Sequence, residues 1–309
     1  MIITMSETTT AEIGARLVAL REEGGAVALG RVLTLVIVAT GSPVGTDALI
    51  DAANQASKEH PCRVIVVDAS GEHGDAGLDA EIRIGGDAGA SEVVLLHPTG
   101  DARAELDTLV IPLLLPDAPI VVWWPAQPPE HPGEDPLGRM AQRRISDVGE
   151  SSDAIAQLAR LGEKYTPGDT DLSWARTTLW RGITAAAMDD VSSPVRAVTV
   201  RGAGHRPSTH LFAAWLAAAF ELDVTLVEEP DATVITGLDI ELADGTITMR
   251  RPEGEVVVSI TQPGQPDHQL AMPKRPLQDC LMEDLRRMDP DATYQRTVLY
   301  GLPRVRVAS

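Results

Sequence analysis

Continuous runs of aliphatic and β-branched residues alternate with amphipathic segments through the first half of the chain. Val, Ile and Leu follow one another in these runs, which is typical of strands covered on both faces in a parallel sheet. The predicted strands cover residues 31–40, 63–69, 81–84, 91–98 and 118–125. Between them, apolar residues at helical spacing predict helices over 46–59 and 102–110. The alternation predicts an N-terminal α/β domain with a doubly wound, mostly parallel sheet.

A helix is predicted before the first strand. Thr9 and Glu12 have the spacing of a capping box, in which each residue satisfies a backbone amide of the other. Ile13, Leu17 and Leu20 follow at helical intervals as far as a pair of glycines. The helix should therefore be about 12–14 residues long.

A sequence of turn-forming residues marks the start of the second half of the chain. A short edge strand at 143–150 and a helix at 154–161 precede the sequence TPGDT at 166–170, which marks the expected domain boundary. Apolar residues that recur at helical intervals then predict two longer helices, over 172–188 and 208–220.

Strands follow one another in the last third of the chain, with few helices between them. They are predicted over 195–200, 224–227, 233–241, 246–250, 255–261 and 269–272. Residues 243–245 form a hairpin turn, and helices over 276–288 and 291–300 close the chain. We therefore predict a Rossmann-like α/β domain without a dinucleotide fingerprint over 1–165. A C-terminal α+β domain with an antiparallel meander should cover 166–309.

Length, charge and cysteine content narrow the class of protein. The chain has 309 residues, more than one hydrophobic core usually organises. Its formal net charge of −19 argues against nucleic acid or an anionic membrane as a partner. The two cysteines, Cys62 and Cys280, suit a reducing compartment. No signal-peptide pattern is present, and the longest apolar run, Val32–Ala39, is too short to span a bilayer. We expect a soluble, cytoplasmic protein.

Familiar catalytic and cofactor motifs are absent from the sequence. No Gly-x-Gly-x-x-Gly follows the first predicted strand, and in the nearest match, at residues 202–204, Pro207 replaces the third glycine. A plain strand–turn–helix junction is favoured there over a cofactor loop. Neither a nucleophile elbow nor a His-Glu-x-x-His pair occurs, and the histidines lack metal-ligand spacing. We predict no catalytic residues, no metal and no cofactor.

Asp169 and Asp171 flank Thr170 in a way that resembles the Asp-x-Asp pair of metal-dependent sugar transferases. Two carboxylates beside the start of a helix more often cap the helix and complement its dipole. Capping is therefore the favoured interpretation.

Trp123 and Trp124 stand side by side at the end of a predicted strand, directly before Pro125. The chain has only ten aromatic residues, and five of them are tryptophan. Neighbouring side chains of a strand point to opposite faces, so either both faces of the sheet are covered or one indole meets a partner. Packing within the sheet and anchoring of a partner protein are both open.

Two more tryptophans, Trp174 and Trp180, share the stretch between residues 120 and 181, around the expected domain boundary, with Arg143, Arg144, Arg176 and Arg181. Tryptophan with arginine is typical of interface hot spots and of cation–π contacts. In an acidic chain this cluster would suit an acidic patch or a phosphorylated metabolite; alternatively, the indoles are core and the arginines are solvated. With their flanking carboxylates, the candidate partner-binding residues are Trp123, Trp124, Pro125, Arg143, Arg144, Asp169, Asp171, Trp174, Arg176, Trp180 and Arg181.

Six segments, spread over both predicted domains, together resemble one known family. They are VLTLVIVA (32–39), HPCRVIVVDA (60–69), LLLPDAPIVVWWP (113–125), DPLGRMAQRRISD (135–147), YTPGDTDLSWARTTLWR (165–181) and LMEDLRRMDPDATY (281–294). The family is that of the glucose-6-phosphate dehydrogenase assembly protein, OpcA. The resemblance implies a protein that is not an enzyme and that binds glucose-6-phosphate dehydrogenase. It would promote assembly and allosteric activation of that enzyme, raising NADPH supply through the oxidative pentose phosphate pathway.

For photosynthetic members of the family, the resemblance implies control by thioredoxin through cysteines. Here Cys62 lies beside the start of a strand, and Cys280 lies on an amphipathic helix next to Leu281. Both thiols are expected to be buried and inert, so thiol switching is not expected.

An alternative reading is an enzyme or metabolite sensor that binds a nucleotide or a sugar phosphate on the parallel sheet. Such sheets bind ligands beyond the carboxyl ends of their strands. Trp124–Pro125 and His97–Pro98 lie at two of these ends, although a fold alone does not assign a function. The sequence makes no prediction about self-association.

Overall fold

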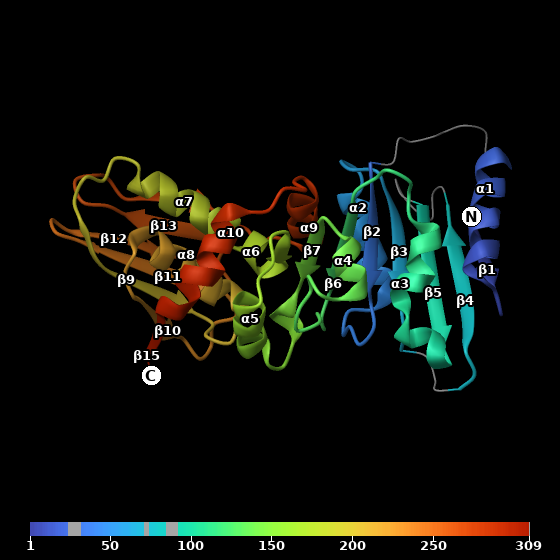
Figure 1. The fold of residues 1–309 in the computed structure, drawn as a ribbon. Helices are drawn as coiled ribbons and strands as arrows, with labels where there is room; N and C mark the ends of the chain where they lie inside the picture. Colours follow the sequence, from blue (N-terminus) through green and yellow to red (C-terminus); the bar gives the residue numbers. More distant parts are fainter. Residues whose placement is uncertain (24–31, 71–73, 85–91, 309) are drawn as a thin grey trace. The chain divides into compact units, whose positions relative to one another are not determined.

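The computed structural model describes residues 1–23, 32–70, 74–84 and 92–308, and Figure 1 labels its elements. The expectation of a mixed α/β chain with two multi-stranded sheets is confirmed. The chain forms two compact units, each with its own sheet. Unit 1 comprises Met1–Asp147, Gly168–Thr170 and Leu277–Pro290; unit 2 comprises Val148–Pro167, Asp171–Pro276 and Asp291–Ser309.

The sheet of unit 1 has the strand order β1-β4-β5-β3-β2-β6-β7-β8. Its strands are β1 Ile2–Met5, β2 Leu33–Val38, β3 Cys62–Val67, β4 Gly77–Arg83, β5 Glu92–Thr99, β6 Ile120–Trp124, β7 Arg143–Ser146 and β8 Asp169–Asp171. Strands β5, β3, β2, β6 and β7 pair in parallel, whereas β4 and β1 add antiparallel pairs at one side. The parallel strands β2, β3 and β6 are buried along nearly their whole length, as their continuous apolar sequences predict. The doubly wound arrangement stays a prediction.

Three strands of this sheet differ from the sequence expectation, and one of them, β8, lies at the residues where the sequence predicts a turn. The sequence pattern does not predict β1, because its four residues alternate between exposed and half-buried and form no long apolar run. The edge strand expected at 143–150 is wrong, since β7 is shorter and lies between β6 and β8. Its place inside the sheet is fixed by the backbone N–H of Arg144, which donates to the Gly168 carbonyl at 2.9 Å.

Unit 1 contains the helices α1 Thr10–Glu23, α2 Thr46–Ala56, α3 Leu106–Val110, α4 Pro136–Met140 and α9 Leu277–Leu285. The capping box of α1 is formed: the Glu12 carboxylate accepts from the Thr9 N–H at 2.9 Å, and the Thr9 hydroxyl accepts from the Glu12 N–H at 3.3 Å. The glycine pair expected to end this helix lies outside the described residues. The helix expected over 102–110 is a 3-10 turn, Gly100–Ala104 (η2), followed by α3. The two are separate because the Glu105 backbone leaves the helical region.

The sheet of unit 2 has the strand order β14-β13-β12-β11-β9-β10-β15. Its strands are β9 Val195–Gly202, β10 Val224–Glu228, β11 Ile235–Leu242, β12 Thr246–Arg250, β13 Val257–Thr261, β14 His268–Ala271 and β15 Val305–Ala308. Strands β11 to β14 pair antiparallel in succession, and β9, β10 and β15 pair in parallel. The sequence pattern does not predict β15, whose four residues are mostly exposed at the sheet edge.

The helices of unit 2 are α5 Ala154–Glu163, α6 Leu172–Arg176, α7 Thr178–Met188, α8 Pro207–Phe220 and α10 Ala292–Arg296. Trp180 of α7 and Phe212 of α8 pack with sheet residues in one apolar cluster. The single helix expected over 172–188 is two helices that meet at Thr177, whose hydroxyl donates to the Trp174 carbonyl at 2.7 Å. The helix expected over 291–300 likewise begins as α10 and continues as a π-helical turn.

The two units are interleaved along the sequence, which differs from the single boundary expected between residues 165 and 166. Residues 148–167 belong to unit 2, and residues 277–290 return to unit 1. The return follows from burial, because α9 packs against α2 with Leu281 and Leu285 inside the core of unit 1. An amphipathic helix sequence indicates that the helix packs, but not against which sheet.

Candidate functional site

The two adjacent tryptophans at the end of β6 are packed inside unit 1. Trp123 pairs in register with Ile37 and Ile145, and its side chain is fully buried. Trp124 points to the other face, is 3% exposed and joins the apolar cluster that includes Leu17 of α1. Both faces of the strand are therefore covered at this point, as the packing interpretation predicts, and Pro125 is buried beside them.

Arg143 and Arg144 are buried in ion pairs rather than exposed on a rim. The Arg143 guanidinium donates to the Asp284 carboxylate at 2.6 Å and to the Asp289 carbonyl at 3.2 Å. Arg144 pairs with the Asp169 carboxylate. The expectation that these two arginines lie on an accessible surface is wrong, because each finds a carboxylate inside unit 1.

The carboxylate of Asp171 caps α6. It accepts from the Ser173 N–H at 2.8 Å and from the Val148 N–H at 3.1 Å, and it is fully buried. The capping interpretation of this residue is confirmed. Asp169 is also buried, so neither carboxylate presents an open metal site of the Asp-x-Asp kind.

The remaining tryptophans of the expected surface are buried in unit 2. The Trp174 indole N–H donates to Asp291 at 2.9 Å, and the Arg181 guanidinium stacks over the Trp174 ring at 3.6 Å from its centroid. Trp180 packs against Phe212 with 5.6 Å between ring centroids. The core alternative therefore accounts for both indoles. Arg181 does not stand free in solvent, because it takes part in a cation–π contact.

The accessible part of the expected surface is small and lies on α6 and α7. Arg176 and Arg181 are half-buried, and Leu179 between them is 36% exposed. Arg176 and Arg181 are what remains accessible of the tryptophan–arginine surface expected from the sequence. Together with Leu179, which was not part of that expectation, we call them the α6–α7 patch.

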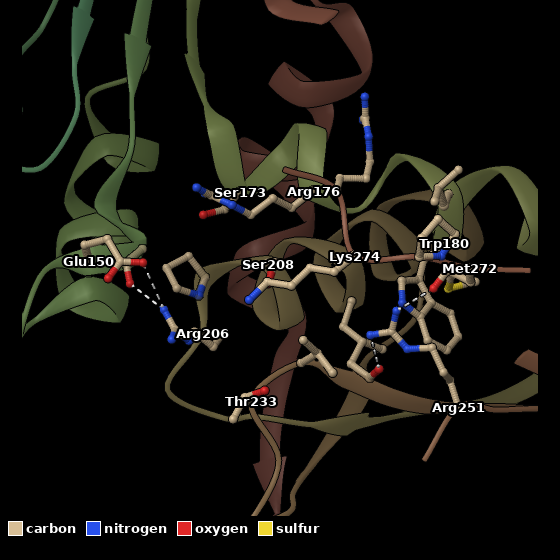
Figure 2. Close-up of a pocket in the computed structure, with 17 residues that line it drawn as sticks. Glu150, Ser173, Arg176, Trp180, Arg206, Ser208, Thr233, Arg251, Met272 and Lys274 are labelled. Carbon is tan, nitrogen blue, oxygen red and sulfur yellow. Dashed lines mark hydrogen bonds and ion pairs between the residues drawn. The ribbon is translucent and has the colours of Figure 1, made fainter. Parts of the chain in front are cut away.

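A pocket of about 130 Å³ opens in unit 2 beside this patch (Figure 2). Figure 2 shows Glu150 and Arg206 at one end, Trp180, Arg251 and Met272 at the other, and Lys274 between them. Five of the lining side chains are basic and one is acidic. The lining comprises Gly149, Glu150, Ser173, Arg176, Leu179, Trp180, Arg206, Pro207, Ser208, Thr233, Val234, Ile235, Arg251, Met272, Pro273, Lys274 and Arg275.

The sequence interpretation includes Arg176 and Trp180 of this pocket and misses Arg206, Arg251, Lys274 and Arg275. The missed cations come from three segments that are far apart in the chain, so no local motif unites them. One usable signal was the strand–turn–helix junction at residues 202–207, because a helix that begins after a glycine turn often faces a ligand.

Arg251 is the most buried cation of the pocket, at 6% exposure. Its guanidinium donates to the Met272 carbonyl at 3.2 Å and to the Ile235 carbonyl at 3.3 Å, and it lies 5.7 Å from the Trp180 ring centroid. Burial lowers the pKa of this guanidinium from its ordinary value, and the Glu253 charge opposes the shift.

His210 on α8 is mostly buried, and its Nε2 lies 2.7 Å from the Gly204 carbonyl in the turn before the helix. Burial lowers the pKa of this imidazole, although the Gly204 bond and the Glu228 charge oppose the shift. A lowered pKa means that the unfolded chain takes up a proton near pH 6.5 while the folded chain does not. The folded state should therefore lose stability as the pH falls below about 6.5.

Replacement of His210 by glutamine should reduce this pH dependence, because the amide keeps a donor for Gly204 but does not titrate. We expect the free energy of unfolding of the parent chain to fall between pH 7.5 and 5.5 more steeply than that of His210→Gln. The difference in slope is at most about 1.4 kcal/mol per pH unit. Urea unfolding at the two pH values measures both slopes, and equal slopes would contradict the prediction.

A second pocket, of about 290 Å³, lies in unit 1 at the carboxyl ends of β2 and β6. Its lining includes Thr40 and Trp124 from these ends, together with Arg103, Asp107 and Asp135. Burial raises the pKa of the Asp135 carboxyl, and bonds from the Gly138 and Leu137 amides oppose the shift. Two carboxylates and one arginine make this pocket a poor match for a phosphate group.

Cys62 and Cys280 are both buried in unit 1, as expected. Within residues 1–23, 32–70, 74–84 and 92–308, no three His, Cys, Asp or Glu side chains gather where they could share a metal ion. Over the same residues, the helices are all too short or too polar to cross a bilayer.

Comparison with known proteins places both halves of the chain in one family. Residues 53–163 match the family described as the glucose-6-phosphate dehydrogenase subunit N-terminal domain, and residues 167–298 match the corresponding C-terminal domain. Two curated relatives, from Synechococcus elongatus and a Synechocystis species, are each named "Putative OxPP cycle protein OpcA". They are 31% and 28% identical over 148 and 155 residues. Each match covers 44% of this chain and about a third (33% and 31%) of the relative's own length.

Two solved structures share a weaker likeness with the chain. A 3-ketoreductase from Actinomadura kijaniata, solved with NADP and TDP-benzene, is 13% identical with a TM-score of 0.43, over 90% of this chain and 99% of that one. Glucose-6-phosphate 1-dehydrogenase from Mycobacterium avium is 12% identical with a TM-score of 0.39, over 90% and 94%. The two family domains, by contrast, follow each other along most of the sequence, and the chain therefore belongs to the OpcA family, that of the glucose-6-phosphate dehydrogenase assembly protein.

Proposed function

We propose that this chain is a non-catalytic partner of glucose-6-phosphate dehydrogenase that promotes its assembly and activates it in the oxidative pentose phosphate pathway. The observation that carries the proposal is the pair of family matches, which together run from residue 53 to residue 298. The curated relatives carry names that point to the same cycle.

Activation by a binding partner requires a difference in affinity. The chain must bind the active form of the dehydrogenase more tightly than the inactive form, since equal affinity would leave their ratio unchanged. A coupling free energy of about 1–3 kcal/mol would raise the relative population of the active form some 5- to 150-fold.

Mixing the purified chain with the dehydrogenase tests the proposal. We expect size-exclusion chromatography with light scattering to detect a complex larger than either protein. We also expect glucose-6-phosphate oxidation to speed up, or to require less substrate, in the mixture. A mixture with no complex and with unchanged rate and substrate affinity would overturn the proposal.

Arg176 and Arg181 of the α6–α7 patch are the part of the expected docking surface that is accessible in unit 2. The two guanidinium groups and the exposed Leu179 side chain suit an acidic, partly apolar surface on the dehydrogenase. The buried tryptophans then support the patch from below rather than touching the partner.

Charge reversal within this patch should weaken the complex. We expect Arg176→Glu combined with Leu179→Glu to raise the dissociation constant at least about tenfold. Charge repulsion at the rim and loss of an apolar contact both make the binding free energy less favourable. Arg196→Glu is the matched control, since Arg196 is an exposed arginine on β9 of the same unit. Biolayer interferometry at two salt concentrations measures all variants. Equal dissociation constants for the double variant and the parent chain would show that the docking surface lies elsewhere on the chain.

The pocket of unit 1 provides a test of the alternative function, an enzyme or sensor that binds a nucleotide or sugar phosphate on the parallel sheet. Its place at the ends of β2 and β6 favours a ligand, but Asp107 and Asp135 in its lining disfavour a phosphate. A thermal-shift screen with NADP, ATP and glucose 6-phosphate distinguishes the alternative from the proposed function. Saturable stabilisation by one of these ligands that is lost in the Arg103→Gln variant would favour the alternative.

A further inference from the structure

The pocket of unit 2 concentrates positive charge in a strongly acidic chain. Five basic side chains and one carboxylate line it, although the whole chain carries a formal charge of −19. The carboxylate, Glu150, lies 3.4 Å from Arg206 at one end of the pocket. Among the described residues Lys274 forms no ion pair, although the Glu253 charge acts on it from a greater distance.

Arg251 supplies the strongest sign that an anion belongs in this pocket. The side chain is more than nine-tenths buried, yet among the described residues its guanidinium bonds only to two backbone carbonyls. Its Nε is buried without a hydrogen-bond partner. The Glu253 carboxylate acts on it only from beyond ion-pair distance. A buried charge without a carboxylate at ion-pair distance is unfavourable, so a bound anion would stabilise this arrangement.

The first turn of α8 also lines this pocket. Pro207 occupies its first position, Ser208 its second, and both line the pocket. This helix has 14 residues, no acidic residue in its first turn and no side-chain cap. Pro207 has no N–H, and the Thr209 N–H already donates to the Arg206 carbonyl at 3.0 Å. The Ser208 N–H and the positive end of the helix dipole therefore favour a bound anion.

The end of the pocket near Arg251 is apolar, and the pocket is small. Trp180 and Met272 lie at the end of the pocket near Arg251 (Figure 2). Ile235 also lines the pocket, and its carbonyl accepts a hydrogen bond from Arg251. A volume of about 130 Å³ is below the roughly 300–1,000 Å³ of pockets that take drug-sized ligands. The pocket therefore suits an anionic group and a few attached carbons, not a whole dinucleotide.

We propose that this pocket binds the phosphate group of a small phosphorylated metabolite, between Lys274, Arg251 and the first turn of α8. The apolar wall at Trp180 would contact the carbon part of the ester. The junction at residues 202–207, favoured from sequence as a plain turn, then positions an anion site. This proposal does not rest on the proposed function, because the binding needs no dehydrogenase.

Isothermal titration calorimetry on the isolated chain tests the proposal with inorganic phosphate, glycerol 3-phosphate, glucose 6-phosphate and AMP as probes, at constant ionic strength. We expect saturable binding, with at least one ester tighter than inorganic phosphate. Lys274→Gln should weaken binding at least about tenfold, because a charge-assisted hydrogen bond is lost. Arg251→Met should weaken it at least as much.

Two controls keep the outcome clear. Arg196→Gln removes the same charge from an exposed position on β9 and should bind as the parent does. Lys274 is exposed, so Lys274→Gln should fold normally even if Arg251→Met does not. Three results would each overturn the proposal: no saturable binding of any probe, equal binding by Lys274→Gln and the parent chain, or no ester tighter than inorganic phosphate.

Discussion

Replacement of Trp123 by alanine is expected to lower the free energy of unfolding by about 3–5 kcal/mol. The indole is among the largest fully buried side chains of the chain and lies at the end of β6 between β2 and β7. Its removal loses the transfer free energy of the ring and leaves a cavity that rigid neighbouring strands fill poorly. Urea unfolding followed by far-ultraviolet circular dichroism measures the change without relying on indole fluorescence.

Trp123→Phe is the control for this prediction. The indole Nε1–H of Trp123 is buried without a hydrogen-bond partner, and phenylalanine removes that unsatisfied donor while it keeps most of the ring. We therefore expect Trp123→Phe to cost much less than Trp123→Ala. A loss below about 1 kcal/mol for the alanine variant would mean that the strand end is not the packed core described above.

Breaking the Arg143–Asp284 pair from either side is expected to cost about 3–5 kcal/mol. Both side chains are nearly fully buried, and the 2.6 Å contact joins β7 to α9 across 141 sequence positions. Arg143→Met or Asp284→Leu alone leaves one charge in the interior without its partner. The double variant removes both charges and should recover most of the loss, since buried pairs replaced by apolar residues are often neutral.

A double-mutant cycle from urea unfolding measures the coupling between the two residues. The control is Arg160→Met, which breaks the exposed Arg160–Asp153 pair in unit 2 and should cost less than about 1 kcal/mol. Additive losses for Arg143 and Asp284 would show that the pair does not hold α9 in unit 1.

Trp123 and Arg143, which the sequence places at a docking surface, are thus expected to stabilise unit 1. Adjacent tryptophans and adjacent arginines have the composition of an interface hot spot, and the same composition occurs in a core whose charges are paired. Burial is what separates the two cases, and it depends on partners such as Asp284 that are remote in sequence.

The sequence by itself determined the local elements whose cause is local. Continuous aliphatic runs placed β2, β3 and β6, the Thr9–Glu12 spacing placed the start of α1, and Asp171 was correctly expected to cap a helix. Family membership also followed from segments that are long and unusual in composition. Each of these features depends on residues within a few positions of one another, which a single sequence displays directly.

Only the tertiary structure decided what depends on residues far apart in the chain. The short edge strands β1 and β15 exist because β4 and β10 offer them hydrogen-bonding edges. The return of α9 to unit 1 and the burial of Arg143 depend on each other. The cationic pocket forms because one fold brings Arg206, Arg251 and Lys274 to the N-terminus of α8. Long-range pairing and burial set these features, since the free energy of a buried charge depends on its neighbours in space and not on its neighbours in sequence.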